Sequence, residues 1–449
     1  MYTAYIGRRL LDLYNRHRRD GPAFSPRAFF DEIFFPLFFD DERYLMLANN
    51  SKFDQKAKQR KAGLAAERLE ALTAFHADTE TLDEPHGHLY LGGTARELDA
   101  ATSSQVTDVA IPVSADEVYL SWFGTAASVG IKGGLSILFD VDDVLLALID
   151  GWDQYRVYMR QTPPLKPYQI DSWNGWWLIH RFSKTFKTSD PLRDFPSGYP
   201  EEPPIKNGVA AFSTPPWIRL LFALALRDDT RQQTIYVYSF GQTNTTIGFV
   251  QLDLPEVRSL PPLYERLFGK TPAFVERGQF VRLYEPAYGF RRACEMGNIG
   301  LRALEPGKLR DFMPVRGSKN QLPTPPSGKN QQEQAVTFAI YQTWIIAMLN
   351  NEDLLAFADE TAEALYAYAG AAGRGKTTHL RAVEEGVLKA THRRAFIDGL
   401  TEILEKDGAH AETFDRLVTE VVKMPASDFP LLLTLIRFKY ALRGQRAAA

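Results

Sequence analysis

The sequence contains little cysteine and no long apolar run. One cysteine, Cys294, occurs among 449 residues, which excludes a disulfide framework and any zinc or iron–sulfur site built from several cysteines. No stretch approaches the roughly 18 uninterrupted apolar residues of a membrane-spanning helix, and the N-terminal segment lacks the apolar core of a secretory signal. We therefore expect a protein of the reducing cytoplasm that makes no contact with a membrane.

A strong charge of one sign is also absent, because the net charge is −3. Taken over the whole chain, this value does not favour binding to nucleic acid. Cations are nevertheless concentrated in three segments, which cover residues 8–19, 52–61 and 374–394. Such runs are often only solvated surface, but they keep binding to a phosphate backbone open as an alternative.

The composition is that of a folded protein with more than one domain. Hydrophobic residues make up 45% of the chain and charged residues 24%, as in ordinary globular proteins, and a chain of this length exceeds what one core usually serves. Residues 313–333 are rich in Pro, Gly, Ser and Gln and poor in apolar side chains, which is typical of a linker. We expect two domains, at 1–312 and 334–449.

The segment before the linker mixes both kinds of secondary structure. Apolar spacing predicts helices at 3–18 and 56–75. Runs of β-branched and aromatic residues predict strands at 117–123, 135–139 and 279–284, and a hairpin of 234–240 with 247–254. An aromatic run at 29–39 is expected to be buried. Because strands and helices do not alternate strictly, an α+β domain with a mixed or antiparallel sheet is favoured.

The segment after the linker has apolar residues only at helical spacing. One stripe covers residues 336–348, and a last helix is expected from about Ser427 to Leu442. Nothing in this segment alternates as a strand does. We therefore predict that the C-terminal domain is an all-α helical bundle of about five helices.

Residues 370–377 satisfy the pattern G-x-x-x-x-G-K-[ST] of a phosphate-binding loop, which would make the chain an ATPase at Lys376. That motif needs a strand before the loop and an acidic partner for Mg²⁺. A helix is predicted before Gly370 instead, and residues 334–449 contain no such partner. We favour a turn between helices, whose cations bind the phosphates of nucleic acid.

A second pattern places Asp140 and Asp142 after an apolar run, as in the first motif of haloacid-dehalogenase-type phosphatases. Asp140 would be the nucleophile and Asp142 the general acid, with Mg²⁺ between carboxylates. However, no lysine lies between Thr214 and Asp228, where the later motifs would fall. The simpler interpretation makes Asp142 the N-cap of a helix at 144–158.

Several polar segments carry groups that suit nucleic acid. Amides able to contact base edges stand beside a lysine at Asn49, Asn50, Ser51 and Lys52. Glycines that permit close approach of a backbone surround another lysine at Gly130, Lys132 and Gly133. Further amides and aromatic rings occur at Gln242 and Asn244, at the hairpin tip, and at Gln169, Trp173, Asn174 and Trp177. Each segment alone resembles an ordinary turn, but their occurrence in one chain indicates nucleic-acid binding.

Three histidines and several carboxylates also occur in residues 76–88, as a divalent metal site would require. Polar surface loops have the same composition. We predict no metal and no other cofactor.

With this layout the chain resembles the large subunit of a type I CRISPR Cascade complex. The resemblance rests on an α+β N-terminal domain with amide-and-lysine loops, a hairpin that contains Gln242 and Asn244, a linker, and a helical tail similar to the family's small-subunit-like bundle. It covers most of the chain and includes no short diagnostic motif. The net charge of −3 departs from the basic character that DNA binding favours.

The resemblance implies a subunit without catalytic activity. Such subunits recognise the protospacer-adjacent motif in target double-stranded DNA, start strand separation, contact the guide RNA and other Cascade subunits, and help to recruit a helicase-nuclease. Because base pairing with the guide reads the sequence, the protein needs few base contacts and many backbone contacts. Motif reading would fall to Asn49, Asn50 and Lys52, approach to the duplex to Gly130, Lys132 and Gly133, and binding of the displaced strand to Arg374, Lys376, Arg381, Arg393 and Arg394.

Overall fold

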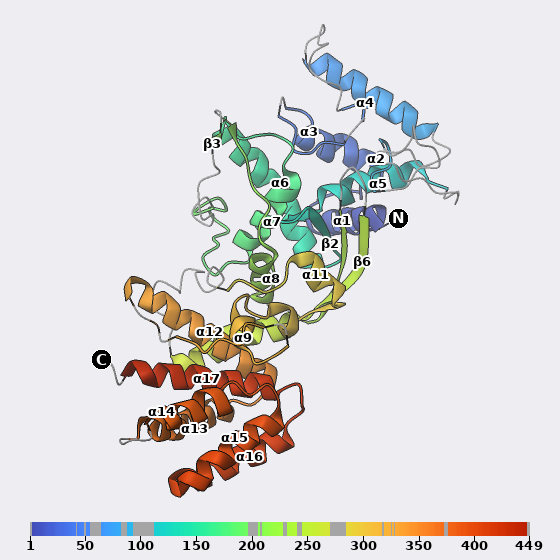
Figure 1. Ribbon diagram of the computed structural model, residues 1–449. Helices are drawn as coiled ribbons and strands as arrows, with labels where there is room; N and C mark the ends of the chain where they lie inside the picture. Colours follow the sequence, from blue (N-terminus) through green and yellow to red (C-terminus); the bar gives the residue numbers. More distant parts are fainter. Residues whose placement is uncertain are drawn as a thin grey trace. The chain divides into compact units, whose positions relative to one another are not determined.

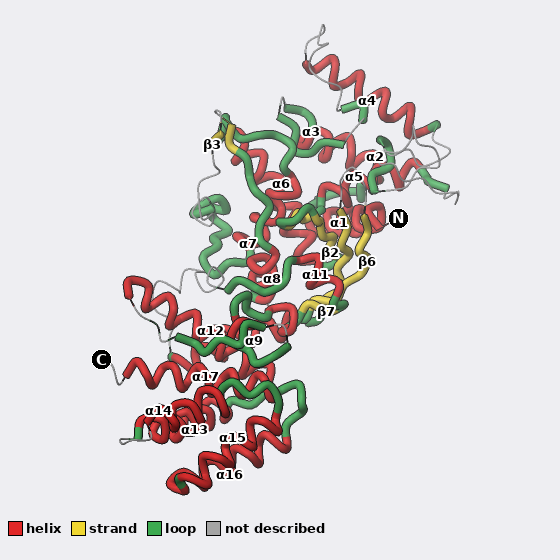
Figure 2. Tube along the Cα trace, in the orientation of Figure 1, coloured by secondary structure: helices red, strands yellow, loops and turns green. Residues whose placement is uncertain are grey.

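The structure is a computed structural model. It describes residues 2–41, 43–48, 51–53, 64–81, 88–92, 112–195, 205–206, 209–227, 231–239, 245–269, 284–316, 318–324, 326, 328–371 and 376–446. Helices predominate in it, together with a small five-stranded sheet (Figures 1 and 2). This confirms the predicted fold class, an α+β region combined with a helical part.

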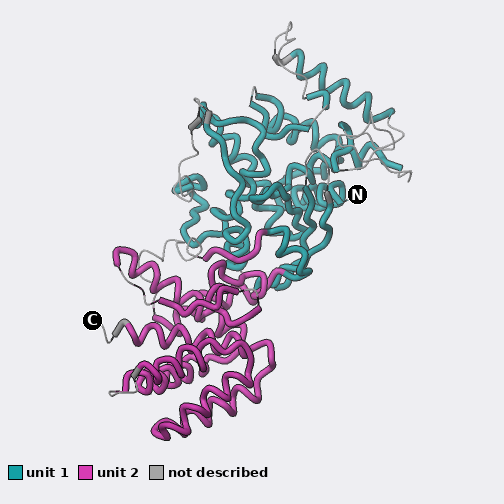
Figure 3. The backbone as a smooth tube through the Cα atoms, viewed as in Figure 1, with its two compact units in different colours: residues 1–254, 290–298 teal, residues 255–289, 299–449 magenta. Residues whose placement is uncertain are grey.

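The chain forms two compact units (Figure 3). Unit 1 comprises residues 1–254 and 290–298, and unit 2 comprises residues 255–289 and 299–449. This division differs from the predicted one, because the expected linker at 313–333 lies inside unit 2. Arg437 shows the reason, since its buried guanidinium donates to the side-chain oxygen of Asn320 at 2.7 Å and to the carbonyl oxygens of Asn320 and Gln321 at 3.0 Å.

Unit 1 contains the sheet and the N-terminal helices. Its helices are α1 (Tyr2–His17), α2 (Pro26–Phe29), α3 (Phe35–Phe38), α4 (Leu64–Glu80), α5 (Ala115–Ala126), α6 (Asp142–Gln161), α7 (Ile170–Arg181), α8 (Trp217–Ala225) and α11 (Phe290–Glu295), with a π-helical turn at Phe30–Phe34 between α2 and α3. Its strands are β1 (Val129–Ile131), β2 (Leu135–Phe139), β3 (Ile205–Lys206), β4 (Val209–Ala210), β5 (Gln233–Ser239) and β6 (Thr245–Leu252), and β7 (Asn298–Ile299) begins at its last residue.

The sheet has the strand order β1-β2-β5-β6-β7, and β3 pairs separately with β4. The pairs β1–β2, β2–β5 and β5–β6 are antiparallel. The predicted hairpin and the strand at 135–139 are therefore confirmed. Residues 279–283 of the third predicted strand lie outside the described residues.

The strand predicted at 117–123 is wrong, because these residues belong to helix α5. Ser114 and Glu117 form a capping box that starts this helix. Its apolar side chains are buried on several sides rather than along one stripe, so the sequence shows no helical period there.

Helices α1 and α5 pack with their backbones in contact. A Cβ atom at Gly7 would lie 1.9 Å from the carbonyl oxygen of Leu120, and one at Gly124 would lie 1.9 Å from that of Thr3. No side chain fits at either position. The predicted helix at 3–18 thus owes its place to glycine as well as to its apolar stripe.

The aromatic run at 29–39 is buried, as predicted, and fills the core beside α5. Four of its rings are almost fully buried, those of Phe30, Phe34, Phe38 and Phe39. Phe34 stacks on Phe38 with ring centroids 4.2 Å apart. The burial of several phenylalanines stabilises unit 1 by about 2 kcal/mol for each ring.

Unit 2 is helical. It contains α9 (Leu254–Phe268), α12 (Gln331–Leu349), α13 (Asp353–Gly370), α14 (Lys376–Arg381), a π-helical turn at Ala382–Val387, α15 (Arg393–Lys406), α16 (Ala411–Lys423) and α17 (Phe429–Arg446), with short 3-10 turns at Leu301–Leu304, Leu309–Phe312, Gly328–Asn330 and Gly408–His410. Helix α17 is the central one, because its residues from Leu431 to Phe438 are buried in nearly unbroken sequence.

Candidate nucleic-acid interface

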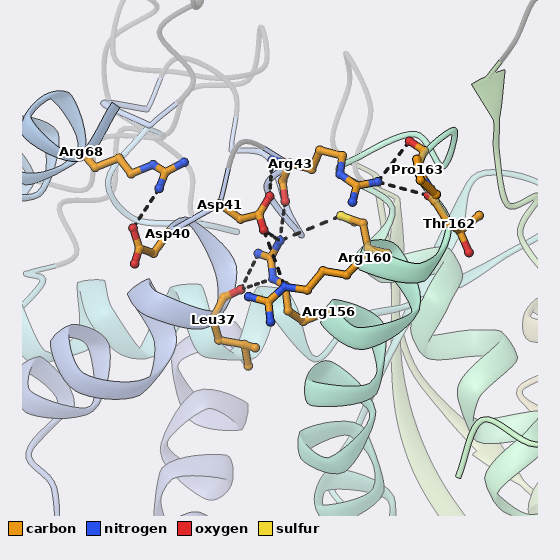
Figure 4. A network of polar contacts seen from close by, with 10 residues as sticks. Leu37, Asp40, Asp41, Arg43, Arg68, Arg156, Arg160, Thr162 and Pro163 are labelled. Carbon is orange, nitrogen blue, oxygen red and sulfur yellow. Dashed lines mark hydrogen bonds and ion pairs between the residues drawn. The ribbon is translucent and has the colours of Figure 1, made fainter. Parts of the chain in front are cut away.

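Arginines from two helices contact the segment after α3, of which residues 40–41, 43–48 and 51–53 are described and which is here called the 40–53 turn (Figure 4). Arg156 of α6 is almost fully buried. It donates from Nε to the carbonyl oxygen of Leu37 at 3.1 Å and from Nη1 to that of Arg43 at 2.7 Å, and Nη1 lies 3.5 Å from the Asp41 carboxylate. Burial lowers the pKa of Arg156 to about 10, so its guanidinium stays charged at neutral pH.

Carboxylates of the 40–53 turn pair with arginines of α4 and α6. Arg68 of α4 bonds Asp40 at 2.9 Å, and Arg160 lies 3.9 Å from Asp41. Within the described residues, the guanidinium of Arg43 contacts the carbonyl oxygens of Thr162 and Pro163 at 3.2 Å and no carboxylate. Three guanidinium groups thus approach two carboxylates of the turn, as Figure 4 shows.

Arg68 is also incompletely bonded. Its side chain is 9% exposed, and among the described residues only Nη1 has a partner, while Nε and Nη2 are buried without one. A buried donor without an acceptor costs about 1–3 kcal/mol. The sequence analysis did not identify Arg68 as part of this site.

The predicted motif-reading residues belong to this turn. Asn49 and Asn50 lie outside the described residues, and Ser51 is buried. The ammonium of Lys52 lies 2.9 Å from the Asp78 carboxylate of α4, with about a third of each side chain exposed. Lys52 is therefore accessible, but Asp78 neutralises part of its charge.

A second predicted loop lies at one end of the sheet. Lys132 is exposed in the turn between β1 and β2, and its backbone N–H donates to the carbonyl oxygen of Pro215. Gly133 has a positive φ of 115° and open space around it, so glycine suits the turn there. Gly130 is buried instead, and a Cβ atom there would lie 2.9 Å from Oδ2 of Asp171.

The β1–β2 turn and the last residue of β5 lie at the same end of the sheet. Ile131 pairs with Leu135, and β2 runs antiparallel to β5. Ser239, the last described residue before the hairpin tip, donates to the carbonyl oxygen of Gly134 at 2.8 Å. Gln242 and Asn244 lie outside the described residues. The end of β5 therefore contacts the β1–β2 turn.

The carboxylates of the alternative phosphatase motif are held by α1. Arg9 donates to Asp140 at 2.7 Å and to Asp142 at 2.5 Å, and the Tyr5 hydroxyl donates to Asp140 at 2.5 Å. The predicted N-cap is wrong, because Val141 occupies that position without a side-chain bond and Asp142 begins α6. The Asp142 carboxylate accepts a hydrogen bond from Arg9 instead.

The predicted cations of the C-terminal part have different surroundings. A helix, α13, precedes the turn at 370–377, as predicted. Arg374 lies outside the described residues, Lys376 begins α14, and Arg381 is exposed at its end. Arg393 donates to the carbonyl oxygen of Met424, whereas Arg394 is exposed and 3.9 Å from Asp398.

The aromatic and amide patch expected in α7 is part of the core. Trp173, Asn174 and Trp177 are buried, and Asn174 donates to the carbonyl oxygens of Ala126 and Ser128. The interpretation as a base-stacking surface is therefore wrong, because packing uses these rings.

The histidine-rich segment is divided. His76 belongs to α4, where Nδ1 lies 2.7 Å from the Tyr119 hydroxyl and Nε2 lies 2.9 Å from Asp31, and burial lowers the pKa of His76. His86 lies outside the described residues. In the described part of the chain, no group of three or more His, Cys, Asp or Glu side chains is placed to hold a metal ion.

Comparisons with protein-family models, curated proteins and solved structures found no match to this chain. Among the described helices, none combines the length and apolar character needed to cross a bilayer. Function is therefore inferred from the side chains described above.

Proposed function

We propose that this protein is a non-catalytic, DNA-binding large subunit of an RNA-guided antiviral effector complex. In this role it recognises the protospacer-adjacent motif in duplex DNA, helps to open the duplex and holds the displaced strand. Its partners are the guide RNA, the target DNA, other Cascade subunits and a helicase-nuclease that is recruited after binding.

The observation that carries this proposal is the accessible ammonium of Lys52, which follows the amides at 49–50 in the sequence. About a third of its side chain is exposed, and the guanidinium of Arg43 in the same turn contacts carbonyl oxygens and no carboxylate within the described residues. A phosphate offers several strong acceptors and the opposite charge. Asn49 and Asn50 precede Lys52 closely in the sequence, and their side-chain amides would contact the base edges.

The β1–β2 turn at the end of the sheet supports the same role. Lys132 supplies a cation there, and Gly133 leaves the backbone open to close approach. Backbone contacts of this kind position a duplex without reading its sequence.

Two substitutions of opposite effect test the proposal. Lys52→Ala removes a cation, so we expect duplex affinity to fall about fivefold and the salt dependence to lose about one unit of slope. Asp78→Asn releases Lys52 from its ion pair, so affinity should rise. Fluorescence anisotropy of a labelled duplex, measured at several salt concentrations with the full chain, reports both effects.

Lys406→Ala is the matched control, because Lys406 is similarly exposed and also paired, to Glu402 at 2.6 Å. It should leave duplex binding unchanged. Equal duplex affinity of wild type, Lys52→Ala and Asp78→Asn would contradict the proposal, as would Mg²⁺-dependent phosphate release that Asp140→Asn abolishes.

A further inference from the structure

Four aromatic rings from α1 and the sheet form one cluster in unit 1, here called the aromatic face: Tyr2, Tyr5, Tyr236 and Phe249. Tyr2 lies at its centre, with ring centroids 5.5 Å from Tyr5, 4.6 Å from Tyr236 and 5.2 Å from Phe249. Tyr236 and Phe249 are directly opposite each other on β5 and β6, with centroids 5.2 Å apart. Figure 1 shows the N-terminal end of the chain beside β6.

The aromatic face is open to solvent although its rings touch one another. Phe249 is 62% exposed and Tyr5 is 46% exposed. The opposite face of the same two strands is core, because Ile235, Val237 and Val250 are buried. The strand alternation therefore sends one set of apolar side chains inward and leaves aromatic rings on the outside.

Polar groups border the rings on the same side of the sheet. Gln251 donates from Nε2 to the Thr234 hydroxyl at 2.8 Å, and Thr246 lies 3.5 Å from the Tyr236 hydroxyl. An irregularity in the pairing follows Val237, opposite Gly248, whose φ is 100°. Bulges of this kind change the direction of side chains near functional sites.

Charged groups of both signs belong to the elements of the aromatic face, and the Tyr5 hydroxyl donates to the Asp140 carboxylate, which Arg9 also bonds. Arg8 is exposed one helical turn after Tyr5. Lys132 stands at the end of the sheet where Ser239 of β5 contacts the β1–β2 turn. The surface therefore combines ring faces, hydroxyl and amide groups and cations with one carboxylate, that of Asp140, which Arg9 pairs.

We propose that the aromatic face binds single-stranded nucleic acid by stacking unpaired bases on Phe249 and Tyr5. This inference rests on the proposed function, in which the duplex is opened. Every exposed apolar group of the face is aromatic, and each nucleobase has a ring face that can stack on it. The flanking cations complement the phosphates of a strand. A duplex would gain little here, because its bases already stack on one another.

The test measures binding of a labelled single-stranded oligonucleotide to the full chain by fluorescence anisotropy, with DNA and RNA of the same sequence. Phe249→Ala should weaken binding about 5-fold to 100-fold, the range measured for the loss of one stacked base. Phe249→Trp should retain it, whereas Phe249→Leu, which keeps an apolar side chain, should not. Comparison of the two oligonucleotides identifies which strand is held.

Val422→Ala is the matched control, since Val422 is 61% exposed on α16 of unit 2, and it should bind normally. Thermal unfolding checks that Phe249→Ala is folded. Equal affinity of wild type, Phe249→Ala and Phe249→Leu for both oligonucleotides would overturn the inference, as would loss of a protein partner in Phe249→Ala while oligonucleotide binding persists. If the wild-type protein binds duplex DNA but no single-stranded oligonucleotide, this inference alone is refuted. If it binds neither the duplex nor a single strand, the proposed function is refuted too.

Discussion

The buried guanidinium of Arg156 should determine whether the 40–53 turn keeps its conformation. In Arg156→Met the carbonyl oxygens of Leu37 and Arg43 lose their donors. Each unsatisfied acceptor costs about 1–3 kcal/mol, and relief of the cost of burying a cation offsets part of this loss. We expect the free energy of unfolding of unit 1 to fall by about 2–3 kcal/mol.

Arg160→Met provides the comparison for this effect. Arg160 lies one helical turn further along α6 and approaches the same Asp41 carboxylate, but its side chain is 67% exposed. Exposed ion pairs contribute about 0–1 kcal/mol, so this variant should unfold almost as wild type does.

Urea unfolding followed by tryptophan fluorescence measures the difference. Six of the seven tryptophans belong to unit 1, so the signal reports mainly on the unit that contains Arg156. The Arg156 variant should shift the midpoint with little change in the slope. Duplex affinity should fall with it, because the turn also positions Lys52. If both arginine variants unfold alike, the carbonyl contacts of Arg156 do not hold the turn.

Two further predictions concern packing and pH. Gly7→Ala should destabilise unit 1 by about 3 kcal/mol or more, because the new Cβ meets the Leu120 backbone. Gly444→Ala should instead stabilise α17 by about 0.5–1 kcal/mol, since a Cβ there has only an ordinary contact with Tyr366. Thermal unfolding measures both effects, and a shift of the melting temperature in the same direction for both variants would refute the packing argument. Burial lowers the pKa of His180, so the unfolded chain binds more protons, and the free energy of unfolding should fall as the pH drops below about 6.5. In His180→Gln this slope should decrease in pH-dependent urea unfolding, and an unchanged slope would show that His180 does not cause it.

Local patterns in the sequence predicted much of the fold. The hairpin of β5 and β6 and the burial of residues 29–39 followed from residue type and spacing, and both are confirmed. Helix α5 did not follow, because buried residues surround it on several sides and hide its period. The expected N-cap at Asp142 failed for a different reason, since Arg9 of α1 binds that carboxylate from more than a hundred residues away.

The arginines of the candidate site could not be predicted from the sequence either. Arg43, Arg68 and Arg156 stand far apart in the chain, and none belongs to a recognisable motif. Folding brings them to the segment that the amide and lysine pattern had already indicated. The pattern indicated a candidate site at this segment, whereas the contacts of the arginines depend on the tertiary fold.

The aromatic face could not be predicted from local sequence patterns alone. Alternation along β6 places Val250 and Leu252 on the buried side and therefore requires Phe249 to point outward. An isolated outward phenylalanine carries little meaning, because single exposed apolar residues are common on protein surfaces. The structure gives it meaning by bringing Tyr2 and Tyr5 of α1 against Tyr236 and Phe249. A surface of several rings can bind an extended strand where one ring cannot, so the tertiary contact between α1 and the hairpin makes the site.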